Sequence, residues 1–405
     1  MIAAFDPILE VFVIFAAAKA AGEVFVRLRQ PAIVGELLIG LVLGPHLLGW
    51  LHVNLATTTL SELGIVVLLF TAGLETRRTD LMSVGRPALA ASVAGMVLTG
   101  GVALLVVRAF GFSLRGAAVA AVALAPSSVG IAARAFGDLG MVASRPARVV
   151  LGAAVVDDVV TLAVLPLALG IGGERSTASV LVSLSGAVGF LVLVSSVGPR
   201  LARRYGGALE RPRIRRAPFV VSFAICLGLA ALAERVGLVA LVGAFLAGMV
   251  LAESREQYDL ERRMEPLFDF LVPFFFVLAG ATLDPRALAD AGIPFLVTVV
   301  GATLVAKLIG CGAGAVGLPL RERLAVGSGM VPRAEVTLAV AAAALGSGDI
   351  QPPVFSALVA AVLVTSLVAP ALIKASVPAA ERRARLHPPE APPEGSGRVE
   401  GEGVA

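Results

Sequence analysis

Charged residues are scarce in this sequence. They make up 15% of its 405 residues, against about 25% in a typical soluble domain. Apolar residues make up 58%, and the mean hydropathy is +0.92. A soluble core of this size cannot hide so much apolar surface, so lipid must cover part of it. The basic residues occur in short segments between apolar stretches, which excludes the clustered basic face of a nucleic-acid-binding protein.

Cysteine and histidine are also scarce. Cys226 and Cys311 both lie within apolar stretches and have no CxxC spacing, which excludes a disulfide framework. The three histidines are His46, His52 and His387, too few and too scattered for a histidine-based metal site. We therefore expect no cofactor. The N-terminus has no basic segment before its first apolar stretch and no clear cleavage site, so we interpret that stretch as a retained helix rather than a signal peptide.

Apolar stretches long enough to span a bilayer recur along the chain. They predict an all-α polytopic membrane protein with about thirteen transmembrane helices. A transmembrane domain over residues 1–378 would precede a disordered cytoplasmic tail over 379–405, which is polar and rich in proline and glycine. The predicted helices cover residues 6–28, 32–49, 60–76, 87–110, 115–136, 146–170, 178–200, 217–235, 237–253, 266–282, 291–315, 322–346 and 352–376.

Arginine is distributed unevenly between alternate connections, which predicts the orientation in the membrane. One set of connections carries few basic residues, namely Arg108, Arg115, Arg175, Arg235 and Arg286. The other set is rich in arginine, at 27–29, 77–86, 145–148, 200–216, 255–263 and 321–323. The second set should face the cytoplasm. In a cell (inner) membrane this places the N-terminus outside and the C-terminus inside.

An internal repeat is visible as three pairs of similar segments at nearly the same offset. They are 34–43 with 242–251, Ala72-Gly73 with Ala279-Gly280, and Pro126 with Pro332. The offset corresponds to seven helices. Because seven is odd, the two halves have opposite orientations in the membrane, and inverted repeats of this kind are typical of secondary transporters. The alternative is chance similarity between apolar helices. Chance could account for any one of the matches, but three matches at nearly the same offset favour a true repeat.

Asp157 and Asp158 lie near the centre of the predicted helix 146–170. One charged group at mid-membrane costs about 2.5–3.5 kcal/mol on insertion scales, so two acids predict a cavity, a partner or both. Adjacent helical residues point about 100° apart, so one Asp can face a partner and the other a cavity. The same geometry argues against an aspartyl protease, whose carboxylates converge on one bond. Lys307, deep in the predicted helix 291–315, is the expected ion-pair partner, since snorkelling from that depth is less favourable.

Two predicted helices contain interruptions at matched positions of the repeat. They read Ala-Pro-Ser-Ser-Val-Gly over 125–130 and Gly-Met-Val-Pro-Arg-Ala-Glu over 329–335. A proline inside a helix frees a backbone carbonyl, and broken helices at mid-membrane can hold cations. A simple proline kink is the alternative reading. Charged residues near the breaks are expected to pair with each other or to cap helix dipoles; they are Arg134, Asp138, Arg333 and Glu335. Glu36, Lys19 and Glu23 are expected to be structural.

Together these segments resemble the monovalent cation:proton antiporter superfamily, in its bacterial sodium/proton and Kef-type branch. The matching segments are 30–45, Leu-Leu-Phe-Thr-Ala-Gly-Leu-Glu at 68–75, 128–131, Asp157-Asp158, Lys307 and Pro-Arg-Ala-Glu at 332–335. The resemblance implies a homodimer with a rigid dimerisation domain and a mobile core crossed by two discontinuous helices. It further implies that Asp158 binds the cation or protons, that Asp157 pairs with Lys307, and that exchange is electrogenic.

The sequence departs from the family pattern beside the expected ion site. The first break has Ser127-Ser128 where a Thr-Ser pair is usual, and Thr337 stands where glycine is more usual. We still count Ser127 and Ser128 among the candidate ion ligands, and Pro126 and Pro332 among the supporting residues. Because of these departures, the sequence does not determine whether the transported cation is Na⁺, Li⁺ or K⁺.

The predicted function is exchange of a monovalent cation, Na⁺ in the first place, for protons by alternating access. The alternatives are a K⁺/H⁺ antiporter, a cation channel and a sodium-coupled solute symporter. A channel needs a continuous pore with several weak sites, and a symporter needs a roomier polar cavity than these Ala- and Val-rich helices indicate. Kef-type relatives carry a nucleotide-binding regulatory domain, for which the tail is too short, so gating by NAD(H) or glutathione is not expected. No enzymatic activity is predicted.

Overall fold

The computed structural model describes residues 7–51, 53–76, 85–142, 144–170, 189, 217–235, 239–252 and 259–377. Every regular element within these ranges is a helix, as the sequence predicts. The predicted helix 178–200 and the predicted tail 379–405 lie outside the described residues, apart from residue 189.

The described helices form two groups. The α3 group comprises α1 (Pro7–Arg27), α2 (Ala32–Leu43), α3 (Leu55–Glu75), α10 (Ala217–Arg235), α11 (Ala240–Leu251) and α13 (Leu260–Thr282). The α8 group comprises α5 (Arg86–Ala109), α6 (Leu114–Ala123), α7 (Val129–Asp138), α8 (Arg145–Gly170), α15 (Ile293–Gly314), α16 (Leu320–Gly329), α17 (Glu335–Gly346) and α18 (Pro352–Ser376). The short helix α14 (Pro285–Ala291) follows α13 and leads into α15.

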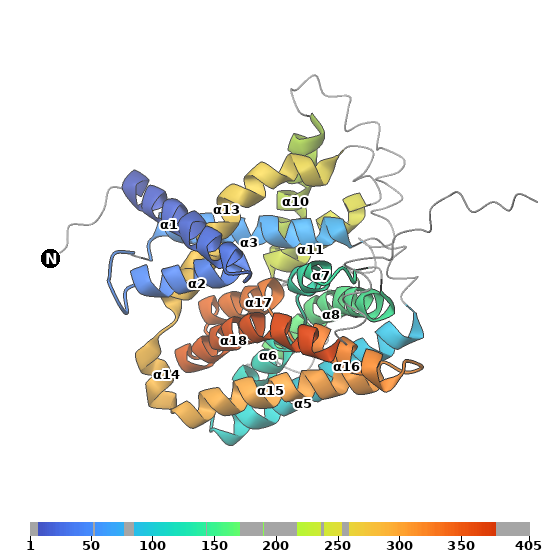
Figure 1. Ribbon diagram of the computed structural model, residues 1–405. Helices are drawn as coiled ribbons and strands as arrows, with labels where there is room; N and C mark the ends of the chain where they lie inside the picture. Colours follow the sequence, from blue (N-terminus) through green and yellow to red (C-terminus); the bar gives the residue numbers. More distant parts are fainter. Residues whose placement is uncertain are drawn as a thin grey trace, which may run out of the picture.

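Packing is extensive within each group and sparse between them. The main contacts across the boundary are those of α3 with α17 and of α18 with α2 and α13. In Figure 1 the α3 group occupies the upper part of the molecule, while α5 and α15 run side by side along its lower edge.

The predicted inverted repeat is visible in the packing of four helices. Gly40 of α2 lies against the backbone of Val277 in α13, so closely that a Cβ on the glycine would overlap the carbonyl group. Gly248 of α11 lies in the same way against the backbone of Phe70 in α3. Since α11 repeats α2 and α13 repeats α3, the two crossings are equivalent. Small residues at helix crossings allow this close approach in membranes.

Both predicted interruptions are real breaks. The predicted helix 115–136 is two helices, α6 and α7, and the predicted helix 322–346 is likewise α16 and α17. The two breaks cross, because the backbone N–H of Ser128 donates to the carbonyl oxygen of Pro332 at 2.8 Å. A simple proline kink would have kept each helix continuous.

Several helix ends differ from those predicted. α2 ends at Leu43 rather than at residue 49, because the next residue, Gly44, takes an extended conformation. α3 begins at Leu55 rather than 60, because Asn54 and Thr57 form a capping box that satisfies the first free N–H groups. α13 begins at Leu260 rather than 266. The helix α14 was not predicted, since it is too short to give a spanning signal.

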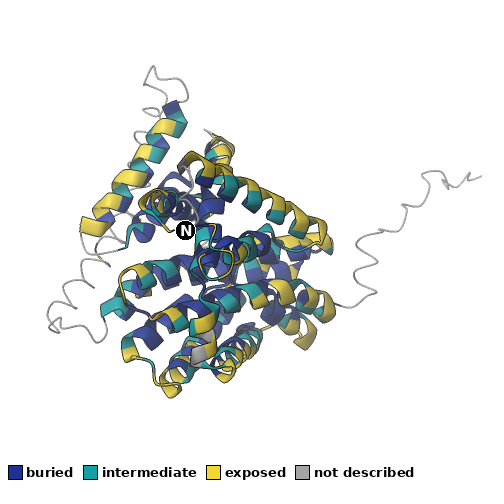
Figure 2. Cartoon of the chain, turned by 90° about the vertical axis from the view of Figure 1, so that its left-hand side faces the viewer, coloured by how far each residue is buried: buried dark blue, intermediate teal, exposed yellow. Residues whose placement is uncertain are grey.

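Seven of the described helices are long and apolar enough to cross a membrane, namely α3, α5, α8, α10, α13, α15 and α18. Shorter apolar helices are α2, α6, α11 and α17. Large apolar side chains are exposed along the outer faces of α5 and α15, among them Leu89, Val93 and Val97 of α5. Their spacing of four residues makes a continuous stripe, as expected for a face in contact with lipid. Figure 2 shows exposed residues on the outside of the bundle and buried residues within it.

Candidate functional site

Asp157 and Asp158 lie side by side on α8, in the interior of the α8 group. The Asp157 side chain is fully buried, and Asp158 retains 7% exposure. Adjacent helical positions point about 100° apart, so the two carboxylates have different neighbours, as the sequence predicts.

Hydrogen-bond donors surround the Asp157 carboxylate. Lys307 Nζ of α15 forms the expected ion pair with Asp157 Oδ2 at 2.7 Å. Ser92 Oγ of α5 donates to Oδ1 at 2.6 Å. Ser127 Oγ, in the first break, lies 3.2 Å from Oδ2. Three helices and a break thus converge on one carboxylate, and its oxygens are engaged within the protein.

Two cations meet the C-terminal end of the half-helix α6. Lys307 Nζ also donates to the carbonyl oxygen of Ala125. Arg333 is fully buried and donates through Nε to the carbonyl oxygen of Leu124 at 2.9 Å. One of its terminal nitrogens donates to the backbone carbonyl oxygen of Thr303 at 3.2 Å. The last carbonyls of a helix carry partial negative charge and lack partners within the helix. Arg333 therefore caps a dipole, one of the roles expected of it.

The serines of the first break have different roles. Ser127 Oγ lies 2.8 Å from the carbonyl oxygen of Met330 at the end of α16, so its one proton is shared between that carbonyl and Asp157. Ser128 caps α7, since its Oγ accepts from the N–H of Ile131 at 3.4 Å. Ser128 Oγ also donates to Glu335 Oε2 at 3.2 Å. The first break is thereby linked to the second break by side-chain as well as backbone hydrogen bonds.

Asp158 has the opposite environment to Asp157. Its Oδ1 is buried and has no hydrogen-bond partner in the part of the chain that the structure describes. The side chain lines a cavity of about 460 Å³ between the two helix groups, together with Ser128 and Glu335. Glu335 is the first residue of α17, where a carboxylate is stabilised by the positive end of the helix. An unpartnered carboxylate oxygen beside a second carboxylate and a hydroxyl is a suitable site for a small cation or a proton.

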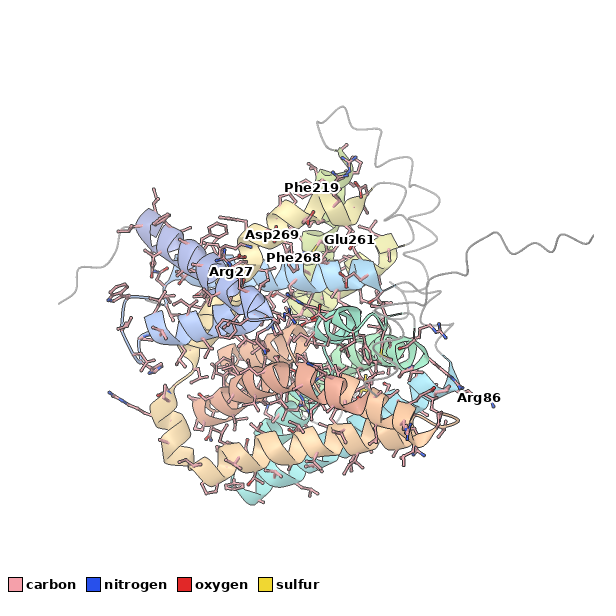
Figure 3. The ribbon with its side chains drawn as sticks, viewed as in Figure 1. Arg27, Arg86, Phe219, Glu261, Phe268 and Asp269 are labelled. Atoms are coloured by element: carbon pink, nitrogen blue, oxygen red, sulfur yellow. The ribbon has the colours of Figure 1, made fainter. Side chains whose placement is uncertain are left out.

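The opposite wall of this cavity belongs to the α3 group and carries charged residues of its own. Lys19 of α1, Glu36 of α2 and Asp269 of α13 line it. Lys19 Nζ lies 3.6 Å from Asp269 Oδ1. Figure 3 labels Phe268 and Asp269, which lie on α13. The cavity extends to Glu75 and Thr76 at the end of α3.

Arg134 and Asp138 lie further from the centre of the site. Both are exposed on α7, and of the two only Arg134 lines the cavity. Pro126 and Pro332 lie in the two breaks and contribute no side-chain polar group, while the Pro332 carbonyl accepts the hydrogen bond from Ser128.

Sequence reasoning missed the hydroxyl of Ser92 and the backbone carbonyl of Thr303. A hydroxyl within an apolar helix commonly bonds to its own helix, as that of Thr303 does. The hydrogen bond of Ser92 to Asp157 and that of Arg333 to the Thr303 carbonyl oxygen join residues of different helices, which no spacing along one helix reveals.

Comparison with known proteins agrees with this arrangement. The sequence profile described as "Sodium/hydrogen exchanger, transmembrane" matches residues 12–377. The chain belongs to the sodium/hydrogen exchanger family. It is 31% identical to the Na(+)/H(+)-K(+) antiporter GerN of Bacillus cereus, covering 91% of this chain and 96% of GerN. It is also 31% identical to the high-affinity Na(+)/H(+) antiporter NhaS3 of Synechocystis, covering 91% and 89%.

Another relative is less similar, and the match covers a smaller share of that protein's length. The glutathione-regulated potassium-efflux protein KefC of Salmonella schwarzengrund is 26% identical, over 90% of this chain and 59% of KefC. The fold matches the solved structure of the sodium proton antiporter MjNhaP1 of Methanocaldococcus jannaschii, with a TM-score of 0.70 and 18% identity over 91% of this chain and 96% of that one. The family is one of transporters, and this chain is a multi-pass membrane protein of it.

Proposed function

We propose that this protein exchanges Na⁺ for protons by alternating access, with Asp158 binding the cation and the proton in turn. The observation that carries the proposal is the Asp158 side chain, which lines a cavity between two helix groups and has a buried Oδ1 without a hydrogen-bond partner among the described residues. A carboxylate at this depth is costly unless it is neutralised. Either a proton or a cation neutralises it, and the two exclude each other at one oxygen.

The groups around Asp158 supply hard oxygen ligands. Ser128 and Glu335 line the same cavity and are hydrogen-bonded to each other. Oxygen donors suit hard cations, and a Na⁺ between Asp158 and Glu335 would have two carboxylates and a hydroxyl within reach. Asp157 would support this site indirectly, since Lys307 and Ser92 already occupy its oxygens.

The α8 group is suited to move as one body. At the far ends of the half-helices, Arg115 of α6 pairs with Asp349 after α17 at 2.6 Å and donates to the Leu169 carbonyl of α8 at 3.0 Å. These contacts join the ends of α6, α8 and α17. Movement of this unit along the sparsely packed α3 group would carry Asp158 from one membrane face to the other.

The predicted orientation places the cavity opening on one side of the membrane. It extends to the end of α3, which the arginine distribution places on the cytoplasmic side. This conformation would therefore be inward-open, with the N-terminus outside and the C-terminus inside a cell membrane. We further propose a homodimer, as the resemblance implies, which light scattering of the detergent-solubilised protein would test.

Proton coupling would use the Asp157–Lys307 pair. Cation entry at Asp158 places a positive charge beside this pair, which weakens the hold of Asp157 on the ammonium group. A proton can then leave Lys307 in addition to the one displaced from Asp158. More than one proton would cross for each cation, so that exchange would be electrogenic.

The decisive experiment is proton flux in proteoliposomes with Na⁺, Li⁺ and K⁺ supplied in turn. We expect Na⁺ and Li⁺ to drive proton movement against a pH gradient. Stronger coupling to K⁺ would favour the K⁺/H⁺ alternative. Cation flux that moves no protons would contradict antiport and favour a channel or a symporter.

A further inference from the structure

Glu36 is a buried carboxylate that the proposed exchange cycle does not use. It is the one charged residue of α2 and is 7% exposed. The sequence alone favours a structural role, in which an ion pair would satisfy the charge. Among the described residues, however, no group donates a hydrogen bond to this carboxylate, and its side chain lines the same cavity as Asp158.

Lys19, which lines the cavity together with Glu36, forms an ion pair with another carboxylate. Lys19 of α1 pairs with Asp269 of α13 at 3.6 Å. The Glu36 carboxylate lies against α1 at Gly22, where a Cβ would be 3.6 Å from its Oε1. The other charged residues that line the cavity are Glu75 of α3, Arg134 of α7, Asp158 of α8 and Glu335 of α17.

Glu36 and Asp158 belong to different helix groups. Glu36 is on α2, within the closely packed α3 group, whereas Asp158 is on α8 across the sparse boundary. If the α8 group moves during exchange, Glu36 faces the site of Asp158 in this conformation and not in the other. A contribution from Glu36 to ion binding would then act at one membrane face only.

We propose that Glu36 is a second carboxylate station for the transported cation, fixed on the α3 group and used only while the cavity is open. A cation leaving or approaching Asp158 would pass Glu36, whose negative charge favours its presence in the cavity. The inference rests on the proposed exchange function. It predicts that Glu36 raises the apparent cation affinity at the membrane face where the cavity opens. At the opposite face Glu36 should have no effect on this affinity.

The test compares Glu36→Gln with the wild-type protein in right-side-out and everted vesicles, where Na⁺ is added to each face in turn. We expect the Na⁺ concentration for half-maximal proton flux to rise at least about five-fold at the cavity face, in line with typical coupling between sites. It should not change at the other face. Labelling of a separate Glu75→Cys variant with an impermeant maleimide identifies the cavity face independently.

Two further variants separate ion binding from a structural role. Glu36→Asp keeps the charge and should restore most of the affinity at the cavity face. Glu23→Gln removes an exposed carboxylate of α1, paired with Arg27 at 2.8 Å and outside the cavity lining, and should shift neither face. Equal shifts at both faces, a shift at the opposite face alone, no shift at either, or lowered thermal stability without a one-sided shift would each overturn the proposal. A wild-type protein without cation-driven proton flux would instead overturn the exchange function.

Discussion

Asp157 and Asp158 are adjacent in the chain, yet one is surrounded by donors and the other has a buried oxygen without a partner. Asp157 contacts Lys307 at 2.7 Å and Ser92 at 2.6 Å, whereas the side chain of Asp158 lines the cavity between the two helix groups. This difference is the basis for our proposal that Asp157 holds the site together while Asp158 binds the ion.

Asp158→Asn should abolish cation-driven proton flux while the protein stays folded. The reason is that a neutral amide cannot release a proton in exchange for a cation. Flux in proteoliposomes and monodispersity in detergent are the measurements. Asp138→Asn, which neutralises an exposed carboxylate at the end of α7, is the matched control and should keep full activity. Wild-type flux in a monodisperse Asp158→Asn sample would contradict the assignment.

Lys307→Gln and Asp157→Asn should each destabilise the protein, by about 3–5 kcal/mol for removal of one member of a buried pair. The double variant should cost less than the two single losses added, because it leaves no unpaired buried charge. Thermal unfolding in detergent measures all three.

The same pair should set the response of exchange to membrane voltage. Without Lys307, fewer protons would move for each cation, so that the voltage dependence of flux in liposomes should weaken. Strictly additive stability losses together with unchanged voltage dependence would show that the two residues do not act as a pair.

Ser92→Ala should lower stability by about 1.5–3 kcal/mol, the usual contribution of a hydrogen bond to a charged group. It removes the 2.6 Å bond to Asp157 and leaves Oδ1 without that donor. Ser222→Ala is a matched control, because the buried hydroxyl of Ser222 has no hydrogen-bond partner and its loss should be nearly neutral. Equal unfolding temperatures for the two variants would argue that Ser92 does not stabilise the carboxylate.

Gly40→Ala and Gly248→Ala should both reduce stability, by about 1–3 kcal/mol or more, as expected for overpacking. In each case the new methyl group would overlap the backbone of the crossing helix. The equivalent positions in the repeat predict similar losses. Gly101→Ala in α5 meets nothing within 4 Å and should instead stabilise its helix by about 1 kcal/mol. Normal thermal stability of Gly40→Ala would mean that the crossing can open without cost.

The sequence by itself determined the membrane class, the repeat and the two breaks. Apolar stretches of spanning length expose more apolar surface than a soluble fold can bury, so lipid must cover it. A proline interrupts a helix through its own backbone, because it has no N–H to donate, and the sequence therefore locates the breaks. The pairing of Asp157 with Lys307 was also predictable, because two buried opposite charges at membrane depth have few other partners.

Only the tertiary structure decided which groups complete the site. The hydroxyl of Ser92 and the backbone carbonyls of Leu124, Ala125 and Thr303 meet the charged residues across helices that are distant in the chain. Glu36 was expected to be structural, and its place on the cavity wall follows from the packing of α2 opposite α8. Periodicity along a helix indicates which residues share a face, but the helix that this face meets depends on packing between distant segments, which the local pattern does not contain.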